Sequence, residues 1–159
     1  MLLDKITFHS KSFDQLTTIE LYKILQLRQQ VFVVEQDCPY LDADDLDQEA
    51  MHVIGSHESG EVHAYARVLP VGTSYPEYAS IGRIITSEAS RGTGLGARLM
   101  KESLALCRQL HHKDIKISAQ VYAEKFYTKF GFESVGTGYL EDGIPHVGMV
   151  YVIKNSPEE

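Results

Sequence analysis

The 159-residue chain contains no tryptophan, two cysteines, and 15 lysine and arginine residues against 22 aspartate and glutamate residues. Two cysteines are too few for a disulfide-stapled secreted fold, and the small number of basic residues argues against a nucleic-acid-binding face. The sequence shows neither an apolar run of membrane-spanning length nor a secretory leader. Its formal net charge of -7 also disfavours attraction to anionic membranes. These absences predict a cytoplasmic protein with reduced thiols and with no nucleic-acid or membrane partner.

Apolar residues make up 43% of the chain, which is enough for one core in a single domain over residues 1–155, followed by a disordered tail at residues 156–159. Alternating apolar residues predict strands, and apolar residues at helical spacing predict helices. The expected strands are residues 5–13, 51–57, 61–70, 80–86, 114–120, 132–138 and 147–153, and the expected helices are residues 17–33, 95–111 and 123–130. The strand over residues 80–86 is apolar on both faces and is expected to be central. The order of elements predicts an α+β fold, close to α/β, with a mixed, mostly antiparallel central sheet and helices on both faces.

The first helix is marked by a Thr-x-x-Glu capping box at Thr17 and Glu20. Its buried face is expected to consist of Ile19, Tyr22, Leu25 and Phe32. After this helix, residues 35–50 carry seven acidic side chains and Pro39, which is typical of a loop or of a short acidic helical turn. This acidic run is expected to be either a solvated surface or part of a site that holds a cation.

Residues 90–97, Ser-Arg-Gly-Thr-Gly-Leu-Gly-Ala, place three glycines between a strand and a helix. Such a turn gathers backbone N–H groups that can bind a phosphate. A P-loop is excluded because no Lys-Ser or Lys-Thr follows the glycines. The letters of a dinucleotide fingerprint occur at Gly92, Gly94 and Ala97, but five residues separate the strand from the first glycine and no acid ends the next strand. An NAD-dependent reductase is therefore the weaker alternative.

A third pattern in this turn, Arg-x-x-Gly-x-Gly at Arg91, Gly94 and Gly96, resembles the acetyl-CoA pyrophosphate signature of the GNAT superfamily of N-acetyltransferases. Residues 127–132 resemble the second signature of that superfamily, Tyr-x-x-x-Gly-Phe. Similarity to the ElaA-type group of the superfamily extends over residues 28–40, 64–70, 81–83 and 139–146. The resemblance thus covers nearly the whole chain.

The resemblance implies a single-domain GNAT fold and the transfer of an acetyl group from acetyl-CoA to a primary amine by direct attack. The residues that it implies for acetyl-CoA binding are Ile84, Ile85, Thr86, Arg91, Gly92, Thr93, Gly94, Leu95, Gly96, Ala97 and Tyr127. It further implies that Tyr127 returns a proton to the departing thiolate, which is reasonable chemistry for a phenol held beside a thiol. A non-catalytic acyl-CoA-binding or regulatory module with the same fold is the alternative from a different functional class.

For the acceptor, the GNAT arrangement implies that the first helix and the loop after it form one wall of the site. Candidates for binding the acceptor amine are Glu35, His52, Asp142 and His146. An imidazole titrates near neutral pH, so His146 could take a proton from the amine, and Glu35 is the alternative base. The acceptor could be a small molecule or a peptide amine, and a homodimer is compatible with the pattern. No metal is expected, because the sequence lacks His-x-x-x-His, Cys-x-x-Cys and a complete EF-hand loop.

Overall fold

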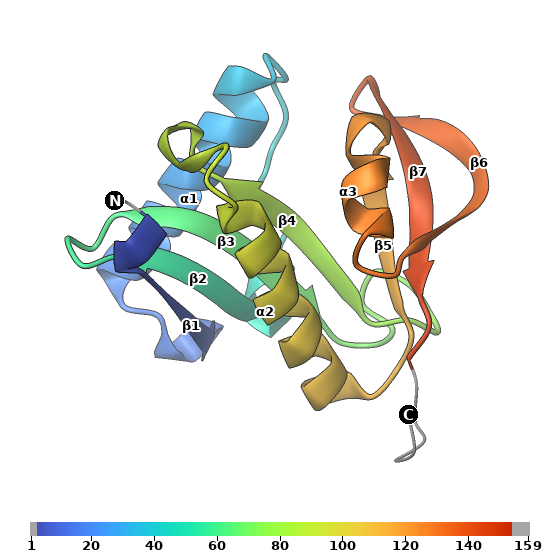
Figure 1. The fold of residues 1–159 in the computed structure, drawn as a ribbon, viewed down its shortest axis with the longest axis horizontal. Coiled ribbons are helices and arrows are strands. Elements are labelled where there is room, and N and C mark those ends of the chain that lie inside the picture. Colours follow the sequence, from blue (N-terminus) through green and yellow to red (C-terminus); the bar gives the residue numbers. More distant parts are fainter. Residues whose placement is uncertain (1–2, 154–159) are drawn as a thin grey trace.

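The computed structural model describes residues 3–153, so the tail expected at residues 156–159 lies outside the described residues. All seven predicted strands and all three predicted helices are present (Figure 1). In chain order they are β1 (Ile6–Ser12), α1 (Thr18–Arg28), β2 (Met51–His57), β3 (Val62–Leu69), β4 (Ser80–Thr86), α2 (Leu95–His111), β5 (Ile115–Gln120), α3 (Glu124–Thr128), β6 (Glu133–Glu141) and β7 (Ile144–Tyr151).

The strands form two antiparallel sheets, one with the order β1-β2-β3-β4 and one with the order β5-β7-β6. The sheets meet at a parallel bridge between Ala79 and Ile115, and from there β4 and β5 diverge (Figure 1). The expected mixed, mostly antiparallel sheet is therefore confirmed, but it is split along its middle. β4 is the strand of the larger sheet that lies next to the smaller sheet, yet it pairs with β3 alone. The edge of β4 that faces away from β3 is consequently available for other contacts.

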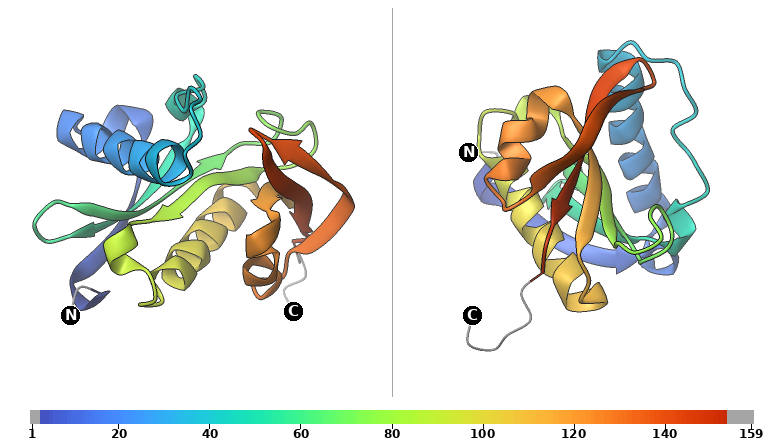
Figure 2. Two further views of the ribbon diagram at one scale, coloured as in Figure 1. Left: turned by 90° about the horizontal axis from the view of Figure 1, so that it is seen from above. Right: turned by 90° about the vertical axis from the view of Figure 1, so that its right-hand side faces the viewer.

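Helices cover both faces of the larger sheet, as predicted (Figure 2). On one face, Ile24, Leu27 and Val31 pack against side chains of β2, β3 and β4. On the other face, α2 buries Leu95, Leu99, Met100, Leu104 and Cys107 in the main core. Burial raises the pKa of the Cys107 thiol to about 12, as expected for a cysteine that acts as a core residue.

The predicted start of α1 is confirmed, because the Thr17 side chain accepts the Glu20 N–H at 3.0 Å and the Glu20 carboxylate accepts the Thr17 N–H at 2.9 Å. The prediction of its buried face is only partly right. Phe32 packs against the buried cluster, but Ile19 and Tyr22 are exposed, and Arg28 is buried beside the apolar side chains. Apolar residues occur on nearly every side of this helix, so periodicity alone does not select the face that the sheet covers. After Arg28 the helix continues as a π-helical segment, η3 (Gln29–Glu35).

Candidate active site

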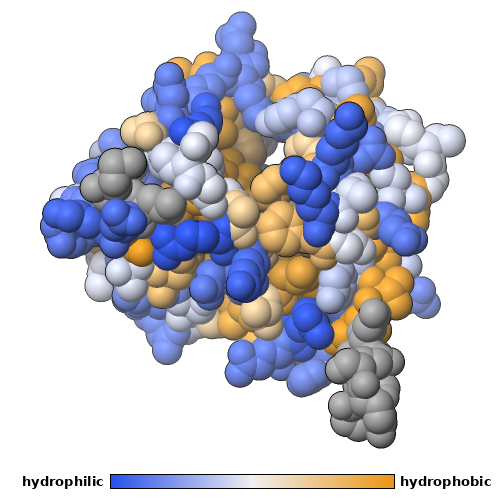
Figure 3. Space-filling view, in the orientation of Figure 1, coloured by the Kyte–Doolittle hydropathy of each residue, from blue (hydrophilic) through white to orange (hydrophobic). Residues whose placement is uncertain are grey.

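A cleft of about 570 Å³ opens where β4 and β5 diverge. The two strands are joined at one end, where the Lys116 N–H donates to the Ala79 carbonyl at 2.9 Å and the Ala79 N–H donates to the Asp114 carbonyl at 3.1 Å. The walls come from η3, the loop after it, β4, β5 and the β6–β7 turn. Figure 3 shows the molecule hollowed between its two halves, with apolar surface inside and hydrophilic residues around the rim.

β4 forms one wall of this cleft with an edge that no strand covers along residues 80–86 of the described chain. Its pairing with β3 shifts register between Tyr65 and Arg67, where Arg83 adopts a φ of 51°. Such a bulge bends a strand and re-aims its side chains and main-chain groups. The three residues of β4 that were predicted to contact the donor, Ile84, Ile85 and Thr86, all line the cleft.

The glycine turn lies between β4 and α2, at the end of the cleft marked by Thr86 and Arg91. Gly92 and Gly94 have φ values of 78° and 87°, and Gly94 is the N-terminal cap of α2. A Cβ atom at either glycine would meet no atom within 4 Å, so the space in front of the turn is open. Because no side chain caps this helix end, its first N–H groups and positive dipole end are available to an anion. Arg91 lines the cleft, whereas residues 92–97 lie beside it.

Arg91 holds the glycine turn against the opposite wall through Glu35. Its Nη2 donates to Glu35 Oε1 at 2.7 Å and to the Thr86 carbonyl at 3.2 Å. Glu35 therefore lines the cleft at the end of the glycine turn, with its charge already paired. An incoming ammonium group would have to compete with Arg91 for this carboxylate.

Tyr127 lies in α3 and lines the cleft across from β4. Phe126 and Phe132 pack edge-on to its ring at centroid distances of 5.2 and 6.2 Å, which fixes its orientation. Burial raises the pKa of the Tyr127 phenol to about 12. The hydroxyl is therefore protonated at neutral pH, as a proton donor must be.

His146 and Asp142 line the cleft at the β6–β7 turn. Nδ1 of His146 lies 2.6 Å from the Ile144 carbonyl, and Nε2 lies 3.4 Å from Glu141 Oε2. Because a carbonyl can only accept, Nδ1 must carry a proton. Asp142 has a φ of 51° and forms the tight turn with Gly143. The Cys38 thiol donates to the Asp142 carbonyl at 3.6 Å, so the loop after η3 reaches across to this turn.

His52 does not belong to this group, which corrects its prediction as an acceptor-binding residue. It is fully buried, accepts the Tyr65 hydroxyl on Nδ1 at 2.6 Å and donates from Nε2 to the Asp47 carbonyl at 2.9 Å. Burial lowers the pKa of His52, so the ring stays neutral. Sequence proximity to the acidic loop was misleading here, because β2 directs this side chain into the protein.

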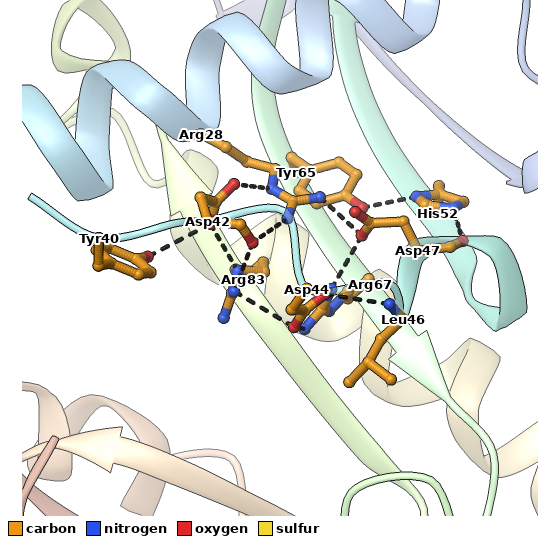
Figure 4. A network of polar contacts seen from close by, with 10 residues as sticks. All are labelled: Arg28, Tyr40, Asp42, Asp44, Leu46, Asp47, His52, Tyr65, Arg67 and Arg83. Carbon is orange, nitrogen blue, oxygen red and sulfur yellow. Dashed lines mark hydrogen bonds and ion pairs between the residues drawn. The ribbon is translucent and has the colours of Figure 1, made fainter. Parts of the chain in front are cut away.

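The acidic loop is solvated only in part: Asp37, Asp45 and Glu49 are exposed, whereas three other aspartates are paired with three arginines (Figure 4). Arg28 binds Asp42 and Asp47, each at 2.7 Å. The remaining ion pairs are Arg67 with Asp47 at 2.9 Å, Arg67 with Asp44 at 2.5 Å, Arg83 with Asp42 at 2.8 Å and Arg83 with Asp44 at 3.4 Å. This arginine–aspartate network ties the loop to α1, β3 and β4. It thereby fixes the wall that brings Cys38, Tyr40 and Arg83 to the cleft.

The network is not predictable from local sequence, because its members are far apart in the chain. The one local signal was an arginine at position 28, on the same side of α1 as Ile24 and Leu27. A buried arginine requires carboxylate partners, since an unpaired charge inside a protein is very costly. The aspartates of the acidic loop at residues 35–50 are the partners that Arg28 finds.

Acidification from about pH 5 toward pH 2 is expected to destabilise the protein through Asp44. Burial would raise the pKa of Asp44, but its ion pair with Arg67 outweighs burial and lowers the pKa to about 2. An unfolded aspartate titrates near pH 3.9, so this stabilisation is complete above about pH 5 and is lost as the pH falls through the folded-state pKa. Urea unfolding across this range should give decreasing free energies in the natural protein and a flatter dependence in Asp44→Asn. Identical pH dependences in the two proteins would contradict the prediction.

Within residues 3–153, no group of three His, Cys, Asp or Glu side chains is arranged to hold a metal ion. The helices of this same region are also too short or too polar to cross a membrane.

Three comparisons relate the chain to known proteins. A family model described as an acetyltransferase (GNAT) domain matches residues 26–153. Protein ElaA of Escherichia coli K12 is 45% identical over 140 residues, which cover 85% of this chain and 89% of ElaA. The crystal structure of Escherichia coli ElaA superposes with a TM-score of 0.85, at 40% identity over 92% of this chain and 99% of that chain. An acyl-CoA N-acyltransferase from Pseudomonas aeruginosa superposes with a TM-score of 0.86, at 38% identity and the same coverage.

Proposed function

Because the chain belongs to the GNAT acetyltransferase family, with ElaA proteins among its relatives, we propose that this acyltransferase moves an acetyl group from acetyl-CoA to a primary amine. The observation that carries the proposal is the open glycine turn at the start of α2, placed beside a cleft that the exposed edge of β4 lines. A turn that binds an anion and a strand edge that binds amides suit the two polar parts of CoA, its pyrophosphate and its pantetheine arm.

The donor is assigned to one side of the cleft. The N–H groups of residues 92–97 at the start of α2 hold the pyrophosphate, and Arg91 at the same end of the cleft adds its positive charge. Main-chain groups of Ile84, Ile85 and Thr86 hold the pantetheine amides. A main-chain N–H of β4 also polarises the thioester carbonyl, and one such donor contributes about 3 kcal/mol to transition-state stabilisation in well-studied enzymes.

The acceptor is assigned to the end of the cleft formed by the β6–β7 turn. Asp142 attracts the ammonium group, and His146 takes a proton from it to produce a neutral nucleophile. Glu35 keeps a supporting role, because Arg91 already occupies its carboxylate.

The reaction balances with these groups. The amine lone pair forms the C–N bond and the C–S bond breaks with its electron pair on sulfur. Of the two protons that nitrogen loses, one is received by His146 and leaves to solvent. The other restores the Tyr127 hydroxyl after Tyr127 has donated its own proton to the thiolate, so that one proton is released overall. Most of the rate enhancement comes from holding the amine and the thioester together in one cleft.

Replacing Tyr127 with phenylalanine is expected to lower kcat by about 10²-fold, because the leaving thiolate loses its proton donor. The affinity for acetyl-CoA should decrease far less than kcat, since the ring keeps its packing. Thiol release with a panel of amines gives kcat, and calorimetry gives Kd. Tyr22→Phe, which removes an exposed hydroxyl from α1, is the matched control and should behave like the natural protein.

Losses of kcat and affinity in equal measure would indicate that Tyr127 serves packing instead. A thermal shift with acetyl-CoA but no thiol release with any amine would indicate that the protein is a non-catalytic acyl-CoA-binding module. A larger shift with NAD than with acetyl-CoA would overturn the donor assignment.

A further inference from the structure

His146 is the centre of a polar cluster that spans all three strands of the smaller sheet. The register places His146 opposite Gln120 on β5 and Tyr139 on β6, so residues 118 and 141 are its diagonal neighbours on the same face. The Tyr139 ring stacks on the imidazole at a centroid distance of 6.1 Å, and its hydroxyl lies 2.5 Å from the Ser118 hydroxyl. Ser118 also donates to Glu141 Oε1 at 3.5 Å.

The contact between His146 and Glu141 depends on one proton. Since Nδ1 already donates to the Ile144 carbonyl, Nε2 of a neutral ring carries a lone pair and faces another acceptor, Glu141 Oε2, at 3.4 Å. A proton on Nε2 changes this contact from two opposed acceptors into a hydrogen-bonded ion pair. The two side chains can therefore share a single proton between Nε2 and Oε2.

Burial gives this site a direction. Both side chains line the cleft, but the His146 side chain is 8% exposed whereas the Glu141 side chain is 52% exposed. A proton that enters at the imidazole can thus reach water through the more exposed carboxylate.

We propose that Glu141 is the positioning and proton-relay partner of His146, and that the pair carries the proton released by the acceptor amine out to solvent. This rests on the proposed function. The N–H bond of the ammonium breaks, its electron pair stays on nitrogen, and the proton binds His146 Nε2. The proton then passes to Glu141 Oε2 and to water, which restores the neutral ring.

The other groups around the pair are consistent with this role. Cys38, Tyr40, Arg83 and Asp142 line the same end of the cleft. Arg83 is already paired with Asp42 and Asp44, so it does not neutralise Glu141. Tyr75 lies near Tyr139 and Glu141, and their electrostatic interaction contributes to a raised pKa of Tyr75 after the larger effect of burial. Glu141 is therefore the carboxylate whose contact with the His146 ring the geometry provides.

Glu141→Gln tests the pair first without any substrate. Nitrogen-15 NMR of the imidazole, assigned with His146→Gln, should show the Nε2 resonance of His146 moved from its position in the natural protein, because the carboxylate that faces Nε2 at 3.4 Å is gone. Glu133→Gln removes an exposed carboxylate from the other end of β6 and should leave this resonance in place. An unmoved Nε2 resonance in Glu141→Gln would overturn the contact between the two side chains, whatever the protein catalyses.

The relay is then tested by thiol release with and without added formate, a small carboxylate. Glu141→Gln should lower kcat about tenfold with the Kd for acetyl-CoA unchanged, and formate should restore part of the lost kcat. A decrease in kcat that formate does not relieve would indicate packing and overturn the relay, as would an unchanged kcat. Absence of thiol release from the natural protein refutes the proposed function separately, because the Nε2 resonance still decides whether the two side chains interact.

Discussion

Gly94→Asp is expected to weaken acetyl-CoA binding by about 10²-fold or more while the protein stays folded. The new carboxylate would stand at the positive end of α2, where the pyrophosphate is assigned, and like charges about 4 Å apart at an intermediate dielectric repel by about 4 kcal/mol. A Cβ atom at this position meets nothing within 4 Å, so no clash arises. The φ of 87° costs a non-glycine residue about 1 kcal/mol, which a folded domain tolerates.

Gly94→Asn is the matched control for this experiment. Asparagine has nearly the same size and the same backbone strain but carries no charge. Calorimetry should therefore show a much smaller loss of affinity for Gly94→Asn than for Gly94→Asp, and circular dichroism melting should show similar stabilities. Equal losses of affinity in the two variants would mean that the shape of the turn, and not its charge, causes the effect. Full affinity in Gly94→Asp would contradict the proposal that this turn binds the pyrophosphate.

Arg28→Met is expected to lower the free energy of unfolding by about 3–5 kcal/mol, which is a large part of the stability of a typical domain. The Arg28 side chain is 1% exposed and neutralises two aspartates, Asp42 and Asp47, that are themselves nearly buried. Methionine fills the space but leaves these carboxylates with excess negative charge. The ion pairs that remain, with Arg83 and Arg67, only partly compensate.

Lys23→Met on the same helix provides the comparison. Lys23 pairs with Glu61 at 2.6 Å, but both side chains are in contact with water. Its loss should cost less than about 1 kcal/mol. Urea unfolding of both variants gives the two values, and similar values would contradict the claim that burial makes the Arg28 contacts important.

The arginine–aspartate network also links stability to the cleft. The Asp42 carbonyl accepts from Arg28 Nη2 at 3.2 Å and from Arg83 Nη2 at 2.8 Å, which holds the loop over β4. Cys38 and Tyr40 in this loop line the cleft. The loop therefore owes its rigidity to residues that do not take part in the proposed chemistry.

Local interactions explain what the sequence predicted correctly. The capping box at Thr17, the apolar period of α2 and the alternation of β5 involve neighbours within a few residues, so their outcome is encoded in short stretches. The glycine turn is of the same kind, because left-handed φ values at Gly92 and Gly94 are a property of those residues. The sequence by itself thus determined the order of elements and the open glycine turn between a strand and a helix.

Only the tertiary structure decided which partners distant charges find. Packing of α1 and two loops on the sheet brings distant residues together. It pairs Glu35 with Arg91, buries His52 and forms the arginine–aspartate network (Figure 4). A carboxylate has the same local sequence signal whether it is solvated, paired with arginine or beside an imidazole. Its environment is set by burial and by the charge that faces it, and both are properties of the folded chain. For this reason the turn at Gly94 could be found from the sequence, whereas the contact between Glu141 and His146 required the sheet.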